Sequence, residues 1–268
     1  MRINGLTLGE ITYKTGLSKT TIHHHIKNIP KSNILKSKLR TISQVLQKRI
    51  ADSRRGKSIK NYTFSRPEKW NPDLVSLIAH FLFDGDISRT ACCYNNRNTV
   101  LIEMVKNLMK SLLRVDDFKL YKDSQSGVFK LCYFNVEIAT FINKKSTELL
   151  NQILIGSRPE KIAFLRAFFD DEGCMTFKKN KRFVRGYQHS LKILELIHKL
   201  LSQFKVESKI DSKFFEIIVS RKENLLRFQK LINFTPGVTV NGARSNSIWK
   251  KSLEKRKILE MAISSYVK

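Results

Sequence analysis

The sequence predicts an α+β fold in which a small all-α domain precedes two similar halves, each an αββαββα unit with an antiparallel sheet. Three observations predict it. The first 50 residues show helical periodicity only, strand-like and helical runs alternate further on, and an apolar helix ending in carboxylates occurs twice. We therefore expect four parts, namely a helical domain at 1–50, a basic linker at 51–70, a first half at 71–156 and a second half at 157–268.

The charge balance indicates the class of partner. Among 268 residues, 50 are Lys or Arg and 23 are acidic, which leaves a formal charge of +27. Such a field favours a polyanion, and nucleic acid is the commonest one inside cells. A membrane surface is the alternative, but the chain has no apolar run of about 18 residues and its cations are spread along its length. We expect nucleic acid as the partner and no membrane contact.

The cysteines and the N-terminus indicate the compartment. Cys92, Cys93, Cys132 and Cys174 include no CxxC pair, and the first residues lack the apolar stretch of a signal peptide. We expect a reduced, cytoplasmic protein without structural zinc that associates with the nucleoid.

Residues 6–29 predict two short helices. The first covers roughly 7–14, a turn follows at Gly16, and Ser18 is a suitable N-cap for the second helix. Three isoleucines form one stripe of that second helix, and polar residues lie opposite. The segment resembles a helix-turn-helix, whose second helix enters the major groove of DNA. The expected contacts are Thr20, His23, His24 and Lys27.

An amphipathic stretch at 34–50 completes the helical domain, and an aperiodic basic segment follows it. Arg54 and Arg55 in this segment fit either a passive linker or an arm that follows the phosphate backbone. We include both as candidate DNA-binding residues.

Two segments repeat a pattern of an apolar helix that stops in carboxylates. They are LVSLIAHFLFDGDI at 74–87 and EKIAFLRAFFDDEGCM at 160–175. Aligning Asp84 with Asp170 places Asp86 beside Glu172, 86 residues further along the chain. The repeat predicts two similar halves related by a pseudo-twofold axis.

These motifs, with the strands and helices that follow them, resemble the LAGLIDADG family of homing endonucleases over about 71–265. The resemblance implies a site-specific double-strand DNA endonuclease in which each half contributes one acid at the centre of a DNA-facing saddle. It implies Asp86 and Glu172 as the catalytic metal ligands, with Mg²⁺ or another divalent cation as cofactor. Because one chain holds both motifs, we expect a monomer.

Strand-like runs at 174–179 and 182–189 follow the second motif. In the family, such strands carry DNA recognition, and a basic or amide residue lies beside the metals. The candidates are Lys178, Arg182, Arg185 and Gln188.

Two features depart from the family pattern. Ile87 stands where the motif has its closing glycine, and the ten residues ISRTACCYNN leave too little chain for a hairpin of two long strands. Two other functions therefore stay open, a non-catalytic transcription regulator with a LAGLIDADG-like domain and an RNA-splicing maturase. Double-stranded DNA is the expected partner, and RNA is the alternative.

Overall fold

The computed structural model describes residues 1–54, 64–178, 181–242 and 251–266. The chain divides into two compact units, Met1–Thr63 and Phe64–Lys268. None of the described helices combines the length and hydrophobicity that a membrane-spanning segment needs.

The described part of unit 1, residues 1–54, contains the helices α1 (Leu8–Thr15), α2 (Lys19–Ile26) and α3 (Asn33–Arg54). Thr7 and Glu10 form a capping box at the start of α1, and Gly16 ends the helix with a φ of 70°. Ser18 caps α2 by accepting a hydrogen bond from the Thr21 N–H at 3.1 Å. The predicted caps and turn are thus present. The buried core of this unit is small and consists of Ile11, Ile22 and Leu35.

Unit 2 contains the repeated α and β elements. Its first half comprises α4 (Pro72–Phe83), β1 (Gly85–Ile87), β2 (Cys92–Asn96), α5 (Thr99–Leu113), β3 (Lys119–Lys122), β4 (Phe129–Tyr133), α6 (Val136–Gln152) and the short 3-10 helix η1 (Ile153–Ile155). Its second half comprises α7 (Arg158–Asp171), β5 (Gly173–Lys178), β6 (Lys181–Tyr187), α8 (Leu191–Gln203), β7 (Lys209–Asp211), β8 (Glu216–Ser220), α9 (Lys222–Leu231) and α10 (Lys255–Ser264).

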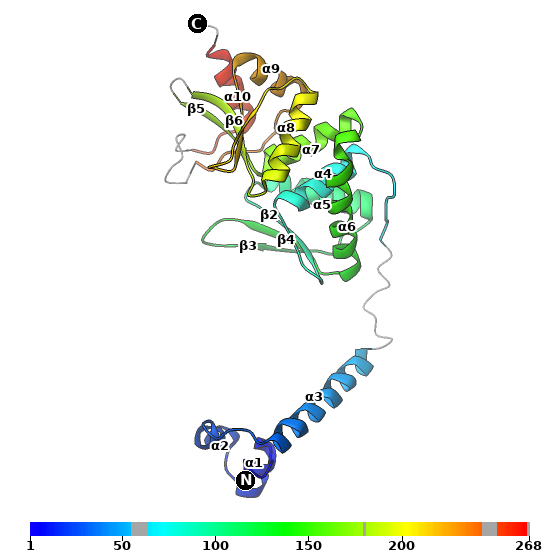
Figure 1. The fold of residues 1–268 in the computed structure, drawn as a ribbon, viewed down its shortest axis with the longest axis vertical. Helices are drawn as coiled ribbons and strands as arrows, with labels where there is room; N and C mark the ends of the chain where they lie inside the picture. Colours follow the sequence, from blue (N-terminus) through cyan, green and yellow to red (C-terminus); the bar gives the residue numbers. More distant parts are fainter. Residues whose placement is uncertain (55–63, 179–180, 243–250, 267–268) are drawn as a thin grey trace. The chain divides into compact units, whose positions relative to one another are not determined.

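Each half forms one four-stranded antiparallel sheet, with the equivalent orders β1-β2-β4-β3 and β5-β6-β8-β7. The β1–β2 hairpin is short, as the ten-residue connection predicts, whereas β5 and β6 pair over six residue pairs. In Figure 1, the labelled strands lie on the left side of unit 2, and α4, α5, α6 and α7 lie on its right side.

The two motif helices, α4 and α7, pack against each other at the centre of unit 2. Ala79 and Ala167 occupy equivalent, buried positions on them, where a small side chain permits close approach. Phe83, at the end of α4, contacts the rings of Phe164 and Phe168 on α7, with centroids 5.4 Å and 5.1 Å away. This packing holds the C-terminal ends of both helices at the same place.

Two boundaries differ from the sequence prediction. The segment 64–70 was expected in the linker, but it packs on unit 2, where Arg66 pairs with Glu137 at 2.6 Å and Lys145 lies over the Trp70 ring. The helical pattern of residues 247–266 predicts a last helix over that stretch, of which 247–250 lie outside the described residues, but α10 begins at Lys255. Just before this helix, backbone hydrogen bonds from the Val240 N–H to the Leu253 carbonyl and from the Lys255 N–H to the Val238 carbonyl flank the bridge between Thr239 and Glu254.

Candidate functional site

The two motif helices end in the same way. Asp84 caps α4 and Glu172 caps α7, and each donates its N–H to the carbonyl four residues earlier. A glycine follows each acid and begins a strand. A Cβ on Gly85 would lie 1.9 Å from the Phe81 carbonyl oxygen, and a Cβ on Gly173 would lie 2.3 Å from that of Phe169. Only glycine fits at these two junctions.

This geometry corrects the alignment of the two motifs. The helix end, the glycine and the first strand coincide when Asp84 is matched with Glu172, a spacing of 88 residues instead of 86. Gly85 pairs with Tyr94 and Gly173 with Gly186, which extends the equivalence into the sheets. Asp86 therefore corresponds to Cys174 and has no acidic counterpart.

Asp86 lies outside the central acidic cluster. Its side chain is 64% exposed on β1 and pairs with Lys130 at 3.2 Å. The structure brings Glu172 together with Asp84, because each half contributes the residue at the end of its motif helix. The sequence analysis predicted Asp86 as the partner of Glu172, and the structure has Asp84 in that position instead.

Asp84 and Glu172 are carboxylates that burial keeps from ionising readily. Burial, and then the neighbouring Asp171 carboxylate, raise the pKa of Asp84 to about 7. Burial, and then the charges of Asp84 and Asp171, raise the pKa of Glu172 to about 8. The two acids line one groove of about 980 Å³. A cation in this groove would stabilise both ionised forms.

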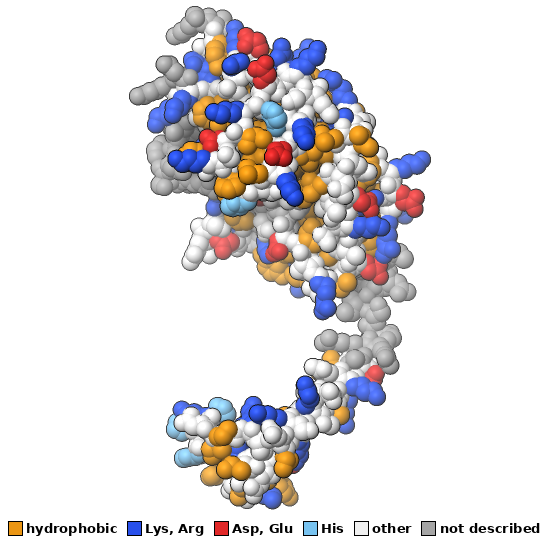
Figure 2. Space-filling view, viewed as in Figure 1, with side chains coloured by type: hydrophobic (Ala, Val, Ile, Leu, Met, Phe, Trp, Pro, Cys, Tyr) orange, Lys and Arg blue, Asp and Glu red, His pale blue; other side chains and the backbone are white. Residues whose placement is uncertain are grey.

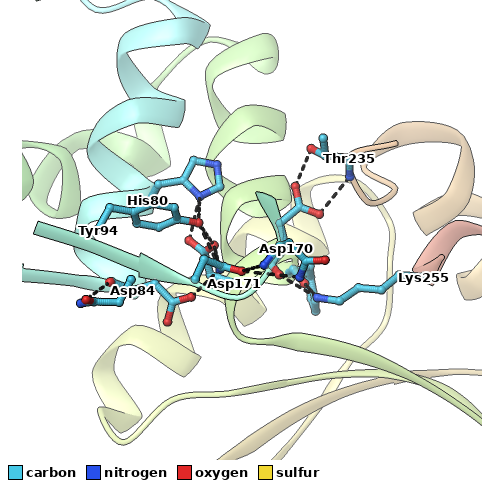
Figure 3. A network of polar contacts seen from close by, with 11 residues as sticks. His80, Asp84, Tyr94, Asp170, Asp171, Thr235 and Lys255 are labelled. Atoms are coloured by element: carbon cyan, nitrogen blue, oxygen red, sulfur yellow. Dashed lines mark hydrogen bonds and ion pairs between the residues drawn. The ribbon is translucent and has the colours of Figure 1, made fainter. Parts of the chain in front are cut away.

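Asp171, in contrast, is fully satisfied by groups of the first half. Its carboxylate contacts His80 Nδ1 at 2.8 Å and accepts hydrogen bonds from the Tyr94 hydroxyl at 2.6 Å and the Asn96 amide at 3.2 Å (Figure 3). Burial alone would lower the pKa of His80, but the carboxylates of Asp171, Asp170 and Asp84 together raise it. A buried ion pair thus joins the two halves beside the acids.

Asp170 and Lys255 form the other side of the cluster. Asp170 accepts hydrogen bonds from the backbone N–H and the hydroxyl of Thr235, at 2.9 Å and 2.6 Å (Figure 3). The Lys255 ammonium donates to the carbonyl oxygens of Phe169 and Asp170, at 3.2 Å and 2.7 Å. Burial lowers the pKa of Lys255, against the attraction of the surrounding acids. Lys255 therefore brings an amino group, held by two backbone carbonyls, to the lining of the acid groove.

The predicted cations of the second sheet divide between its two faces. Lys178 and Arg185 line the groove. Arg182 lies on the opposite face of β6, where its Nε donates to Ser265 and its guanidinium covers the Tyr266 ring. Successive strand residues alternate faces, so Arg182 and Arg185 cannot both face the groove. Gln188 follows β6 and accepts a hydrogen bond from the Ser190 N–H, outside the groove lining.

The predicted DNA contacts of unit 1 are exposed. They are Thr20, His23, His24 and Lys27. In Figure 2, the histidines of α2 form a pale blue group on this unit beside blue Lys and Arg side chains. Arg54 is the last residue of α3, and Arg55 lies outside the described residues.

Sequence reasoning missed the buried amine of Lys255 and the side chains that hold Asp171 and Asp84, namely His80, Tyr94 and Asn96. His80 inside an otherwise apolar helix was one available signal, because a buried imidazole needs a polar partner. Lys255 offered none, since it stands in a run of basic residues whose members look alike in sequence.

The donor set fits a hard divalent cation. Asp84 and Glu172 supply carboxylate oxygens, and Mg²⁺ is commonly bound by one or two carboxylates together with substrate phosphates. Within the described residues, no group of three or more His, Cys, Asp and Glu side chains is arranged to hold a metal alone.

The comparison with protein families concerns the second half of unit 2. Residues 159–233, which begin in α7 and end after α9, match the family model of the LAGLIDADG-like domain. Residues 159–233 form a LAGLIDADG-like domain. The search of curated proteins found no match to the chain.

Solved structures extend the LAGLIDADG fold beyond that segment. Full-length DUF199/WhiA from Thermatoga maritima is similar with a TM-score of 0.50 and 13% identity, covering 75% of this chain and 62% of that one. Mesophilic variants of the homing endonuclease I-DmoI reach a TM-score of 0.47 at 16% identity, covering 60% and 88%. I-DmoI in complex with DNA and Mn reaches 0.46 at 16% identity, covering 60% and 97%. At these identities the likeness concerns the fold, and the predicted α+β LAGLIDADG fold is confirmed.

Proposed function

We propose that this protein is a site-specific DNA endonuclease that uses a divalent cation, with Asp84 and Glu172 as the metal-binding acids. The observation that carries the proposal is the pair itself. One acid from each half ends its motif helix in a shared groove, and neither acid has a cation of the chain bonded to its side chain among the described residues. Such a pair is costly to keep ionised unless a ligand compensates it.

A DNA substrate accounts for the charge around the acids. Lys178, Lys181 and Arg185 line the same groove as the acids, and Lys130 lies on the first sheet. Unit 1 carries 14 Lys and Arg against two acidic residues. Contacts between such cations and phosphates supply most of the affinity of nucleic-acid-binding proteins. RNA offers the same phosphates, so binding of RNA is compared with binding of DNA.

In this proposal, a bound Mg²⁺ would lower the pKa of a water molecule and stabilise negative charge on the phosphodiester. Asp84 and Glu172 would hold the ion at the groove. Lys255, in its protonated form, would place a positive charge close to the scissile phosphate and limit repulsion between the phosphate and the acids. Because one chain supplies both acids, a monomer suffices for cutting both strands.

Unit 1 adds a second DNA contact in this proposal. A helix-turn-helix formed by α1 and α2 would present Thr20, His23, His24 and Lys27 to a major groove. This contact would compensate for the short β1–β2 hairpin, which offers less surface for reading bases than the longer β5–β6 hairpin.

The experiment begins by finding a target. A randomised double-stranded DNA library and a randomised RNA library are each selected for binding in Ca²⁺. The enriched DNA sequences are then incubated with the protein in Mg²⁺, in Mn²⁺ or in EDTA. We expect cleavage in Mg²⁺ or Mn²⁺ and none in EDTA. Asp84→Asn, Glu172→Gln and Lys255→Met should each slow cleavage by about 100-fold or more and change target affinity less than about threefold.

Asp86→Asn is the matched control, because it removes an acid of the same motif that lies outside the cluster. We expect it to keep cleavage within about threefold of the wild type. Tight binding with no cleavage in either metal would contradict the nuclease proposal and support the non-catalytic regulator. Preferred binding of a selected RNA over DNA would support the maturase.

A further inference from the structure

The two proposed metal-binding acids are not equivalent. Asn96 on β2 donates a hydrogen bond from its side-chain amide to Asp84 Oδ2 at 2.8 Å. Asn96 is 8% exposed, so this bond is shielded from water. The Glu172 side chain makes no hydrogen bond or ion pair within the part of the chain that the structure describes. One acid is therefore held in place, and the other is not.

The orientation of Asn96 is fixed by its other contacts. Its side-chain carbonyl oxygen accepts the Asn98 N–H at 2.9 Å, which leaves the NH₂ group facing the acids. The NH₂ group lies 3.2 Å from both the Tyr94 hydroxyl and Asp171 Oδ1. The amide cannot be flipped without losing donors to two carboxylates.

The second half has no such arrangement, although the fold repeats. The pairing of Gly85 with Tyr94 and of Gly173 with Gly186 makes Gln188 the counterpart of Asn96. Phe168 stands in the place of His80, and a Cβ on Gly186 would meet its ring at 2.4 Å. Gln188 turns to the Ser190 N–H instead of Glu172. One side of the pseudo-twofold axis is polar and the other is aromatic.

We propose that Asn96 is a positioning residue that orients Asp84 and not Glu172, so that the two strands of the target are cut by acids with unequal preorganisation. The inference rests on the proposed nuclease function. It predicts a strand-specific role for Asn96, because a carboxylate whose rotamer is already fixed needs no reorganisation when it takes part in the reaction.

The experiment measures each strand separately. The target site is placed in a supercoiled plasmid and in a duplex labelled at one end of each strand, and single-turnover cleavage in Mg²⁺ is followed with excess full-length protein. For Asn96→Ala we expect one strand to be cut about tenfold more slowly than by the wild type, and the other within about twofold. Nicked plasmid should then accumulate before linear product.

Gln188→Ala is the matched control, because it changes the counterpart residue of the other half, and both strands should be cut at the wild-type rates. Asn96→Leu keeps the volume without the donors and serves as a second variant if the alanine variant does not fold. Equal slowing of both strands, or no slowing of either, would overturn the inference while leaving the nuclease function intact. No cutting by the wild type would overturn the proposed function itself.

Discussion

At the scale of single residues, the acids of the groove reduce the stability of the protein. Asp84 and Glu172 have folded-state pKa values of about 7 and about 8, above the ordinary range near 4 of an unfolded chain. The folded state therefore binds protons more tightly than the unfolded state. The contribution of these two acids to the free energy of unfolding is therefore fully present below pH 4. It is lost as the pH rises through the folded-state values of about 7 and about 8.

The corresponding prediction concerns unfolding without metal. At pH 8 in EDTA, Asp84→Asn and Glu172→Gln should each raise the free energy of unfolding by about 2 kcal/mol, because the neutral amide carries no ionisation cost. The gain should vanish near pH 4. Urea titrations of the full chain at both pH values measure it, with Asp86→Asn as the exposed control. A lower free energy of unfolding for these two variants at pH 8 would show that ionised Asp84 and Glu172 do not destabilise the folded protein.

The pairing of the acids depends on information that the local sequence does not contain. The sequence DGDI offers two candidate aspartates, and it does not show which of them ends the helix. The choice depends on where the backbone leaves α4, and the approach of Gly85 to the Phe81 carbonyl decides it. The equivalent glycine, Gly173, was visible in the sequence but was matched with the wrong partner.

At the scale of elements, the site depends on two sharp helix-to-strand junctions. Gly173→Ala would force its Cβ against the Phe169 carbonyl oxygen, which lies 2.3 Å from the ideal position. That oxygen also accepts a bond from Lys255. We expect a loss of about 3 kcal/mol in unfolding free energy and a misplaced Glu172.

Chemical denaturation and the cleavage assay both measure this change. Gly9→Ala is the control, because its Cβ would enter open space on helix α1 and alanine is the better helix former. Wild-type stability and activity for Gly173→Ala would mean that the junction can open without moving the acid.

Strand alternation explains the mixed outcome for the predicted cations. The residues of β6 at 181, 183, 185 and 187 line the groove, so Arg185 faces it and Arg182 packs under the C-terminal helix. The period-two alternation of a strand is a property of the sequence, and it alone assigns these two arginines to opposite faces. The sequence does not show which face is open, because both faces of β6 carry basic residues.

At the scale of the whole molecule, the charge is divided between two units that each carry an excess of cations. We expect that removal of residues 1–63 leaves unit 2 folded, since the buried core of unit 2 is contributed by residues after 70. Its target affinity at about 0.15 M salt should fall by about tenfold or more, with a shallower dependence of log Kd on log salt, because fewer phosphates are neutralised.

Fluorescence anisotropy over a salt series measures both quantities. A full-length variant with alanine at Thr20, His23, His24 and Lys27 tests whether α2 accounts for the loss. If the truncated and full chains bind the selected target equally over the whole series, unit 1 is not a DNA-binding module.

The sequence by itself determined the α+β class, the duplication, the position of both motif helices and the excess of positive charge, because periodicity, repetition and net charge are properties of the chain. Only the tertiary structure decided that Asp84 stands with Glu172 and that Lys255, His80 and Asn96 surround them. These groups come from two motif helices, a strand and a C-terminal helix and lie up to 175 residues apart, from His80 to Lys255. Packing of α4 on α7 brings them together, and no local pattern encodes which distant side chain fills a buried space.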